Sequence, residues 1–551
     1  MTSLNIDITS KEEKIKTQTN SIKIDIVINS GMLANVFINP PSKSQEILIH
    51  LNAIEEIYEN GTRKINRVPV YDFFDTELGH LKLSVGLIKP LIQTLVNTES
   101  VHASDISLMN QRQDNFDYSK IDFNLYTQLY DYKAEKYVQL YDHQIEGIKT
   151  VLKYQQGIIA HPTASGKGEI IVVLSSILQQ YGQTVVILPT SSSLISTAKR
   201  FDRYQIPYCR YHDVRHLESV DKIILSTPKV LLNDVNATNN PLVKSIKYLI
   251  TNEAHHSQAV TWRNLAVTLP SLLRCYGLSA TPSVSAKMDI KKMTLREAMI
   301  RGSHGDIVSE IKSKEIKELI SVPTILNVRY TPIKINEHAR FERDWMRLRH
   351  HLYKKARLEF VASLINLIDT QTKFTTVTFV SLIEKQGDIL YEMYPDTAVA
   401  WYGGGIVKNK LGYDLNKTSI FDAVIDGLVR HVIITSHGRE DINLPNLNVA
   451  LMMELASVGT VKQCVGRVVR HGTPSFLVNI NDTFPNVIKN QAWKRSSIIQ
   501  SEYGAKYINC ESLFEFSELI KQLYIKHKNS PTQIFPVLES IYSSDTEDGE
   551  I

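Results

Sequence analysis

The chain has 551 residues, too many for one ordinary hydrophobic core, so about two to four domains are expected. Its 62 Lys and Arg residues nearly balance 58 Asp and Glu residues, and the formal net charge of +4 excludes a global basic field for polyanions. Any nucleic-acid surface must therefore be local. The four cysteines show no paired metal or redox spacing, and the chain has neither an apolar N-terminal signal nor an apolar run of about 18 residues. We expect a soluble intracellular protein without a membrane partner.

The first part of the chain predicts a leader and a small module. Residues 1–20 are polar and lysine-rich without periodicity, so we expect a mobile leader. Residues 21–130 predict an α+β module that ends in a polar linker over 102–130. Its strands are expected at 22–28 and 67–74, and its helices at 46–58 and 85–97.

The remainder of the chain predicts two α/β lobes in tandem. Short apolar runs alternate with amphipathic stretches over 131–285 and again over 325–515, which is typical of parallel sheets with crossover helices. A connecting helical region is expected at 286–324, and a C-terminal extension with an acidic tail at 516–551. In the first lobe, strands are expected at GIIA, TVVILP, KIILST, YLITNE and CYGLSA, with a helix over 167–181. In the second, strands are expected at 375–380, 397–402, 431–436, 448–455 and 475–482, and helices at 382–394 and 419–429.

A phosphate-binding loop is the first candidate site. The apolar run GIIA is followed by a polar, glycine-containing segment and then directly by a helix. In such a loop, backbone N–H groups at a helix N-terminus surround phosphate while a lysine reaches its oxygens. The alternative is a plain strand-to-helix turn. The candidate ATP-binding residues are Thr163, Ala164, Ser165, Gly166, Lys167 and Gly168.

Further polar groups follow other expected strands. Glu253, at the end of the strand YLIT, is placed to activate the water that attacks a γ-phosphate, the alternative being a solvated strand terminus. Ser279 and Thr281 close the next strand. In the second lobe, Gln463, Arg467 and Arg470 recur at spacings of four and three along one helical face, where two arginines would neutralise phosphate charge.

The order of these motifs resembles that of superfamily 2 helicases of the DEAD/DEAH-like kind. It runs LYDHQ, HPTASGKG, VVILPT, NEAH, GLSATP, TFVS, VIITSHGREDINLP and QCVGRVVRHG over residues 131–482. The resemblance implies two RecA-like lobes with ATP between them. It also implies that Gln144 reads adenine, that Lys167 binds phosphate and that Glu253, Gln463, Arg467 and Arg470 are catalytic. Ser279 and Thr281 would couple ATP to nucleic acid, and Thr190, Thr227 and Thr435 would contact its sugar-phosphate backbone, the alternative being satisfied strand-end hydroxyls.

The segment RVPVYDFFDTELGHLKLSVGLIKPLIQTL resembles the module before the motor in phage recombination helicases of the UvsW type. This resemblance implies a viral DNA helicase or translocase acting on branched or forked DNA in replication, recombination or repair, located in the host cytoplasm. Single-stranded or branched DNA is the expected partner. An RNA helicase or transcript-release factor is the alternative. The sequence does not specify an oligomeric state.

The chain departs from the family at the residues that hold magnesium. Gly168 and Asn252 stand where the family has Ser or Thr and Asp, and Asp441 and Asn443 also depart from its pattern. We therefore expect ATP with weakened Mg²⁺ binding, in which Glu253 and water hold an ion that arrives with ATP. The competing hypothesis is a degenerate nucleotide- and nucleic-acid-binding scaffold without hydrolysis. Adjacent histidines at 255–256 and 350–351 lack a third ligand, so no zinc site is predicted. The amphipathic stretch 339–360 is expected to pack onto a lobe, with nucleic-acid contact as the alternative.

Overall fold

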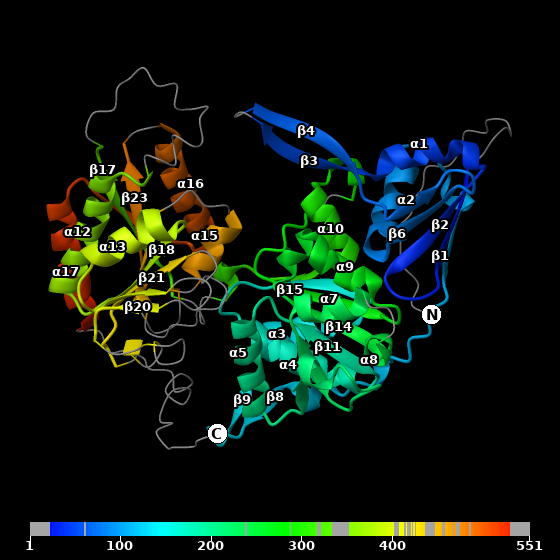
Figure 1. Ribbon diagram of the computed structural model, residues 1–551, viewed down its shortest axis with the longest axis horizontal. Helices are drawn as coiled ribbons and strands as arrows, with labels where there is room; N and C mark the ends of the chain where they lie inside the picture. Colours follow the sequence, from blue (N-terminus) through cyan, green and yellow to red (C-terminus); the bar gives the residue numbers. More distant parts are fainter. Residues whose placement is uncertain are drawn as a thin grey trace.

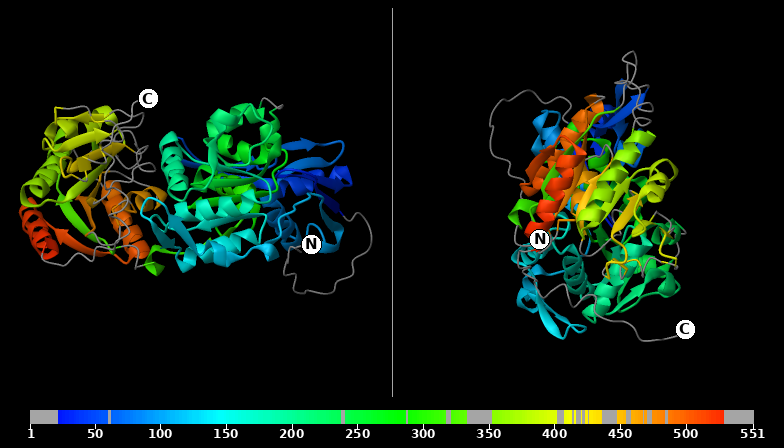
Figure 2. Two further views of the ribbon diagram at one scale, coloured as in Figure 1. Left: turned by 90° about the horizontal axis from the view of Figure 1, so that it is seen from below. Right: turned by 90° about the vertical axis from the view of Figure 1, so that its left-hand side faces the viewer.

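The computed structural model places a small N-terminal module and two α/β lobes in a row (Figures 1 and 2). It describes residues 22–528 except 60–61, 237–239, 287, 317–320, 333–351, 402–406, 413–414, 416–419, 421–422, 425, 436–446, 454–457, 467, 470–473 and 484–485. The predicted fold class is confirmed: α/β, with two tandem RecA-like parallel-sheet lobes and a small α+β N-terminal module. No helix in the described part of the chain is long and apolar enough to cross a bilayer.

The N-terminal module is a five-stranded sheet with two helices, in the strand order β5-β6-β2-β1-β7. Alternate residues of its strands are buried, as in a sheet with one face on a core. Its elements are β1 (Lys23–Ile28), β2 (Leu33–Asn39), α1 (Ser44–Leu48), β5 (Phe73–Asp75), β6 (His80–Ser84), α2 (Ile88–Asn97) and β7 (Ile106–Asn110). The core includes Ile290, Met293 and Ala298 from much later in the chain, so the module is packed firmly onto the first lobe.

The expected helix at 46–58 is wrong over its second half. After α1 the chain forms β3 (Asn52–Glu59), which pairs with β4 (Thr62–Pro69) in a separate antiparallel hairpin that extends from the module (Figure 1). The backbone N–H of Ile54 also donates to the carbonyl of Met293 at 2.8 Å. These non-local pairings override the helical spacing of the apolar residues.

The first lobe, lobe 1, contains a seven-stranded parallel sheet in the order β12-β13-β11-β14-β15-β10-β16. Its strands are β10 (Gln156–Ala160), β11 (Gln183–Ile187), β12 (Tyr208–Arg210), β13 (Ile223–Ser226), β14 (Ile246–Asn252), β15 (Arg274–Ser279) and β16 (Ile307–Glu310). Its helices are α3 (Asp142–Leu152), α4 (Lys167–Gln179), α5 (Ser191–Arg203), α6 (Tyr211–Val214), α7 (Pro228–Asn236), α8 (Pro241–Ser245), α9 (Val260–Thr268) and α10 (Leu295–His304). A hairpin of β8 (Gln128–Asp131) and β9 (Lys136–Gln139) precedes them. Because β16 pairs with β10, the sheet extends beyond residue 285, where we expected the lobe to end.

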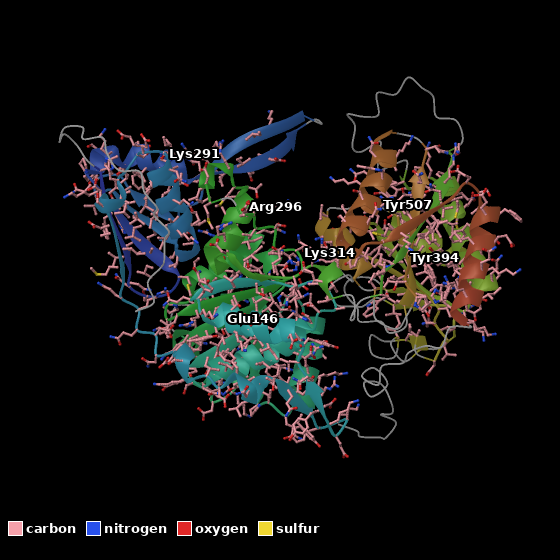
Figure 3. The ribbon with its side chains drawn as sticks, turned by 180° about the vertical axis from the view of Figure 1, so that it is seen from behind. Glu146, Lys291, Arg296, Lys314, Tyr394 and Tyr507 are labelled. Atoms are coloured by element: carbon pink, nitrogen blue, oxygen red, sulfur yellow. The ribbon has the colours of Figure 1, made fainter. Side chains whose placement is uncertain are left out.

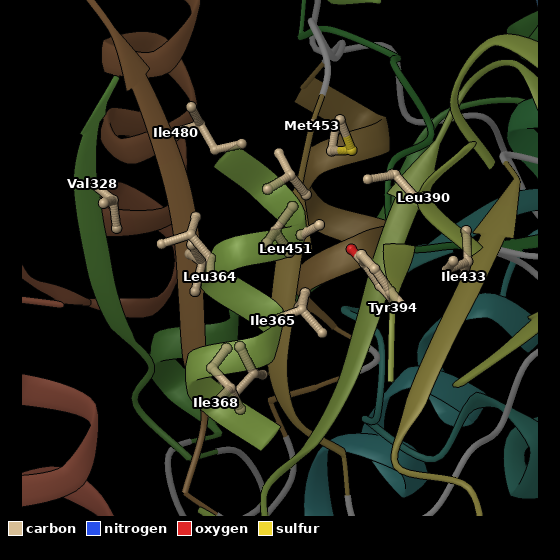
Figure 4. Close-up of a cluster of buried hydrophobic side chains, with 14 of the residues drawn as sticks. Val328, Leu364, Ile365, Ile368, Leu390, Tyr394, Ile433, Leu451, Met453 and Ile480 are labelled. Carbon is tan, nitrogen blue, oxygen red and sulfur yellow. The ribbon is translucent and has the colours of Figure 1, made fainter. Parts of the chain in front are cut away.

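The second lobe, lobe 2, contains an eight-stranded sheet in the order β20-β19-β21-β18-β22-β23-β17-β24. Its strands are β17 (Thr324–Tyr330), β18 (Thr375–Val380), β19 (Ala398–Trp401), β20 (Val407–Asn409), β21 (His431–Thr435), β22 (Leu447–Met452), β23 (Phe476–Asp482) and β24 (Lys506–Cys510). Its helices are α12 (Lys355–Gln371), α13 (Asp388–Met393), α15 (Val458–Val465), α16 (Asn486–Tyr503) and α17 (Leu513–Lys528). Leu364, Ile365 and Ile368 of α12 pack on the sheet in one core (Figure 4). β19 and β23 begin at Ala398 and Phe476, each one residue after the expected strand starts at 397 and 475.

A buried ion pair stabilises the core of lobe 2. Arg357 of α12 donates from Nε and Nη2 to the Asp482 carboxylate at 2.9 and 3.0 Å, and neither side chain is more than 1% exposed. The expected helix at 419–429 lies partly, and the stretch 339–351 entirely, outside the described residues.

The segment after β16 joins the two lobes. Ser313 Oγ donates to Glu502 Oε1 of α16 at 2.8 Å, and Ile316 belongs to a core of lobe 2. Lys314 lies between the two lobes in Figure 3. Part of the expected connecting region 286–324 is therefore attached to lobe 2, while α10 and β16 belong to lobe 1.

Candidate nucleotide-binding site between the lobes

The sheet order of lobe 1 gathers its polar motifs at one edge. β14, β15 and β10 are neighbours and parallel, so the segments that follow them meet at their carboxyl ends. Ligands of open α/β sheets bind at this edge.

The loop between β10 and α4 has the backbone of an anion-binding turn. Ala164 and Gly166 have φ angles of 68° and 76°, and α4 begins directly after Gly166. Lys167 Nζ donates to the carbonyls of His161 at 3.1 Å and Pro162 at 2.9 Å, so its ammonium group lies across the loop. N–H groups at a helix N-terminus with a lysine beside them favour phosphate.

Two side chains of α3 hold this loop. Gln144 Nε2 donates to the Gly166 carbonyl at 2.9 Å, and its Oε1 accepts from the backbone N–H of Tyr141 at 2.8 Å. His143 Nε2 donates to the Ser165 carbonyl at 2.9 Å. Gln144 is 2% exposed and thus positions the loop, whereas its contact with adenine stays a prediction. The sequence offered no signal for His143 beyond its place next to Gln144.

Buried groups under the loop are polar but uncharged. The pKa of His161 is lowered to about 3, first by burial and then by the charges of His143 and Lys167. Its neutral ring meets Ser309 Oγ of β16 at 2.9 Å. The buried Ser165 hydroxyl has no hydrogen-bond partner in the described structure. A buried hydroxyl without a partner is costly unless a ligand satisfies it, so these residues fit a phosphate-bearing nucleotide.

Glu253 follows β14 in a left-handed conformation, with φ 57° and ψ 55°. Such strain in a residue other than glycine concentrates at functional sites. Its Oε2 lies 3.3 Å from His255 Nδ1, and the same ring nitrogen lies 3.0 Å from Ser279 Oγ. Ser279 Oγ also accepts from the backbone N–H of Thr281 at 3.1 Å. One histidine therefore connects the candidate base to the expected coupling residues.

Lobe 2 reaches this site at two points. Gln463 of α15 contacts His255, with 3.2 Å between the two Nε2 atoms. Because the Gln463 amide nitrogen can only donate, this bond favours a neutral His255 that carries its proton on Nδ1, facing Ser279 and Glu253. Gly466 lies against Thr163, where an added Cβ would overlap the threonine side chain and lie 2.8 Å from its Oγ1. Arg467 and Arg470 lie outside the described residues.

The donor set for a chain-held magnesium ion is incomplete. At the two positions where the family has magnesium ligands, Gly168 has no side chain and Asn252 offers a neutral amide, so the adjacent Glu253 supplies the carboxylate of this segment. Among the described residues, no group of three or more His, Cys, Asp or Glu side chains is arranged to hold a metal ion. The site therefore fits a nucleotide better than it fits the family's magnesium ion.

The expected backbone-contacting threonines lie at strand ends. Thr190 caps α5, accepting from the backbone N–H of Ser193 at 3.1 Å. Thr227 directly follows β13 and is partly buried, and Thr435 ends β21 with 4% exposure. The helix cap satisfies the hydroxyl of Thr190 without nucleic acid. Contacts of the three threonines with a nucleic-acid backbone stay predictions.

Comparisons with known proteins agree with this arrangement. Residues 137–284 match the family described as type III restriction enzyme, res subunit. Over 357 residues the chain is 22% identical to the DNA 3'-5' translocase XPB2 of Sulfurisphaera tokodaii, covering 60% of this chain and 78% of that protein. The chain is similar to superfamily 2 helicases. The predicted resemblance to superfamily 2 helicases is thereby confirmed.

Two solved structures are also similar to this chain. The crystal structure of T4 UvsW has 13% identity and a TM-score of 0.39, covering 88% of this chain and 99% of that chain. The structure of S. cerevisiae Dbp5 bound to RNA and ADP BeF3 has 13% identity and a TM-score of 0.47, covering 70% of this chain and 98% of that chain.

Proposed function

We propose that this protein is an ATP-dependent DNA helicase or translocase that acts on branched or forked DNA in replication, recombination or repair, and that it is of viral origin. One observation carries the proposal. The phosphate loop meets lobe 2 at Gly466, and His255, which contacts Glu253, meets it at Gln463, so a nucleotide at the loop would touch both lobes. A ligand that contacts both lobes can change their relative position.

The roles of the residues follow from their positions. Lys167 and the N-terminus of α4 bind the phosphates, and Gln144 fixes the loop below them. Glu253 accepts the proton of the attacking water, while His255 and Gln463 report the state of the site to lobe 2. The roles of Arg467 and Arg470, which lie outside the described residues, come from the sequence resemblance instead: they neutralise charge on the transferred phosphoryl group.

The choice of DNA rests on the relative and on the N-terminal module. XPB2 is named as a DNA translocase. The hairpin β3–β4, which is separate from the five-stranded sheet of the module, carries Lys64 and Arg67 on β4. Lys291 and Arg296 lie near its base in Figure 3, and Arg67 Nη1 donates to the Lys291 carbonyl. The paired strand β3 also carries Glu55 and Glu56, so the hairpin is of mixed charge, but exposed Lys and Arg side chains of this kind can bind a nucleic-acid backbone.

The test is a steady-state ATPase titration with single-stranded DNA, forked DNA and RNA, together with strand displacement on the fork. We expect DNA to stimulate turnover and forked DNA to bind tightest. Stimulation by RNA alone would replace DNA with RNA as the substrate. As a test of the hairpin, Lys64→Glu should weaken binding to forked DNA more than Lys23→Glu, a matched change on the exposed side of β1.

A second candidate function is a non-hydrolysing, nucleotide- and nucleic-acid-binding scaffold. Gly168 and Asn252, which remove two family magnesium ligands, favour it. In that case, nucleotide would bind at the loop but no nucleic acid would stimulate hydrolysis at any magnesium concentration.

A further inference from the structure

Arg200 of α5 occupies the space that a side chain at position 168 would need. A Cβ built on Gly168 would overlap Nη1 and Cζ of Arg200 and lie 2.8 Å from its Nε. In superfamily 2 helicases this direction belongs to the Ser or Thr hydroxyl that binds magnesium. The missing hydroxyl and the arginine are therefore two parts of one arrangement, because a side chain at position 168 would displace the guanidinium group from the place it now occupies.

Glu169, which follows Gly168 in the first turn of α4, holds Arg200 in place. Arg200 Nε lies 2.8 Å from Glu169 Oε1, and the two side chains are 34% and 17% exposed. The other oxygen of Glu169 lies 3.4 Å from where a Cβ of Gly166 would be. The pair thus covers the last glycine of the loop and the first turn of α4. Arg203, on the same helix, pairs instead with Asp131, so the position of Arg200 is specific to the loop.

A polyphosphate requires positive charge at this point, and Arg200 supplies it when its guanidinium group turns from Glu169 to phosphate. Binding ATP or ADP brings several negative charges to the N-terminus of α4, where Lys167 supplies one positive charge. Magnesium usually supplies two more, but the chain offers it few ligands here. A guanidinium group is always charged, and its planar array of N–H donors fits phosphate oxygens.

We propose that Arg200 supplies at this loop the positive charge that magnesium supplies in related proteins, so that the protein binds nucleoside polyphosphates with little dependence on magnesium. Glu169 positions the guanidinium before nucleotide arrives and releases it to phosphate. The proposal rests on the proposed function only in that nucleotide binds at this loop.

The test is equilibrium binding of a fluorescent ADP, mantADP, to the full chain in EDTA and in millimolar magnesium. For wild type we expect dissociation constants within about threefold of each other in the two buffers. Arg200→Ala should weaken binding about tenfold to a hundredfold in EDTA, the size of a lost hydrogen bond to a charged group. Lys199→Ala is the matched control, since Lys199 is exposed on the same helix, and its affinity should equal that of wild type.

A second variant restores the family's hydroxyl. In Arg200→Ala combined with Gly168→Thr, the threonine no longer meets the guanidinium, and binding should recover in magnesium but not in EDTA. Thermal unfolding of each variant shows whether it is folded.

Three outcomes are distinguishable. If wild type binds mantADP only with magnesium, and the dissociation constant of Arg200→Ala equals that of wild type in each buffer, the role of Arg200 is overturned while the nucleotide site stands. If wild type binds no mantADP in either buffer, the nucleotide site and the inference fall together. Magnesium-independent binding that depends on Arg200 supports the inference.

Discussion

Replacing Lys167 and Glu253 separately tests whether nucleotide binding and turnover depend on different residues. Lys167 lies over the phosphate loop and bonds two of its carbonyls, so Lys167→Ala removes a charged donor from the loop. Glu253→Gln keeps the size of the side chain beside His255 and removes only its charge and basicity. We expect the first change to weaken binding and the second to stop catalysis.

The expected magnitudes follow from these contacts. Loss of a hydrogen bond from a charged group costs about 1.5–3 kcal/mol, so the mantADP dissociation constant of Lys167→Ala should rise about 10- to 150-fold. Loss of a general base costs about 10²- to 10⁴-fold in rate, so the kcat of Glu253→Gln should fall by that factor. Its dissociation constant should stay within about threefold of wild type, less than the contribution of one hydrogen bond.

Fluorescence titration with mantADP and a coupled ATPase assay with saturating DNA measure the two quantities on the same preparations. Turnover near that of wild type in Glu253→Gln would refute the assignment of Glu253 as the base. Unchanged affinity in Lys167→Ala would show that phosphate does not bind at this loop.

Three further predictions concern stability. The free energy of unfolding of Glu253→Gly, measured with denaturant, should exceed that of Glu253→Ala by about 1 kcal/mol, because the left-handed backbone at φ 57° strains alanine but not glycine. Equal free energies of unfolding would exclude that strain. Arg357→Ala should cost lobe 2 about 3–5 kcal/mol in denaturant unfolding because it leaves Asp482 buried and unpaired, whereas a loss under about 1 kcal/mol, as for an exposed pair, would contradict this. The third concerns His304, whose pKa burial lowers to about 3 and whose ring contacts Ser257. Since the unfolded histidine takes up a proton near pH 6.5 and the folded one does not, stability should fall as pH drops from about 6.5 towards 3. In His304→Asn, the slope of the free energy of unfolding against pH should correspond to about one proton fewer than in wild type. An identical slope in the variant would refute the assignment of this pH dependence to His304.

The sequence predicts the motif-bearing strands well for a physical reason. Strands such as β11 and β14 contain short apolar runs that are buried on both faces, and polar residues follow these runs at the sheet edge, beginning at Thr190 and Asn252 respectively. Short strands without that contrast, such as β12 and β16, gave no signal. β16 has only two apolar residues, both partly exposed, followed by Ser309 and Glu310, and it forms because its backbone pairs with β10.

The contacts that join motifs were beyond the sequence. His255 was visible only as part of NEAH, but its bonds to Ser279 and Gln463 depend on where two lobes meet. Likewise, Gly168 read as the loss of a metal ligand, because nothing local indicates that Arg200 fills the space. Local patterns specify strands and turns, whereas partners distant in the chain come from tertiary packing.

The shared core of the N-terminal module changes which parts of the chain can act as units. Ile290, Met293 and Ala298 close that core only after the chain has built most of lobe 1 and returned. A cut between the module and lobe 1 would leave apolar surface open on both fragments, and calorimetry of the whole chain should record the module and lobe 1 as a single transition. The same packing attaches the module to lobe 1. We therefore expect the described strands of the hairpin β3–β4 to move together with lobe 1 whenever the two lobes change their relative position.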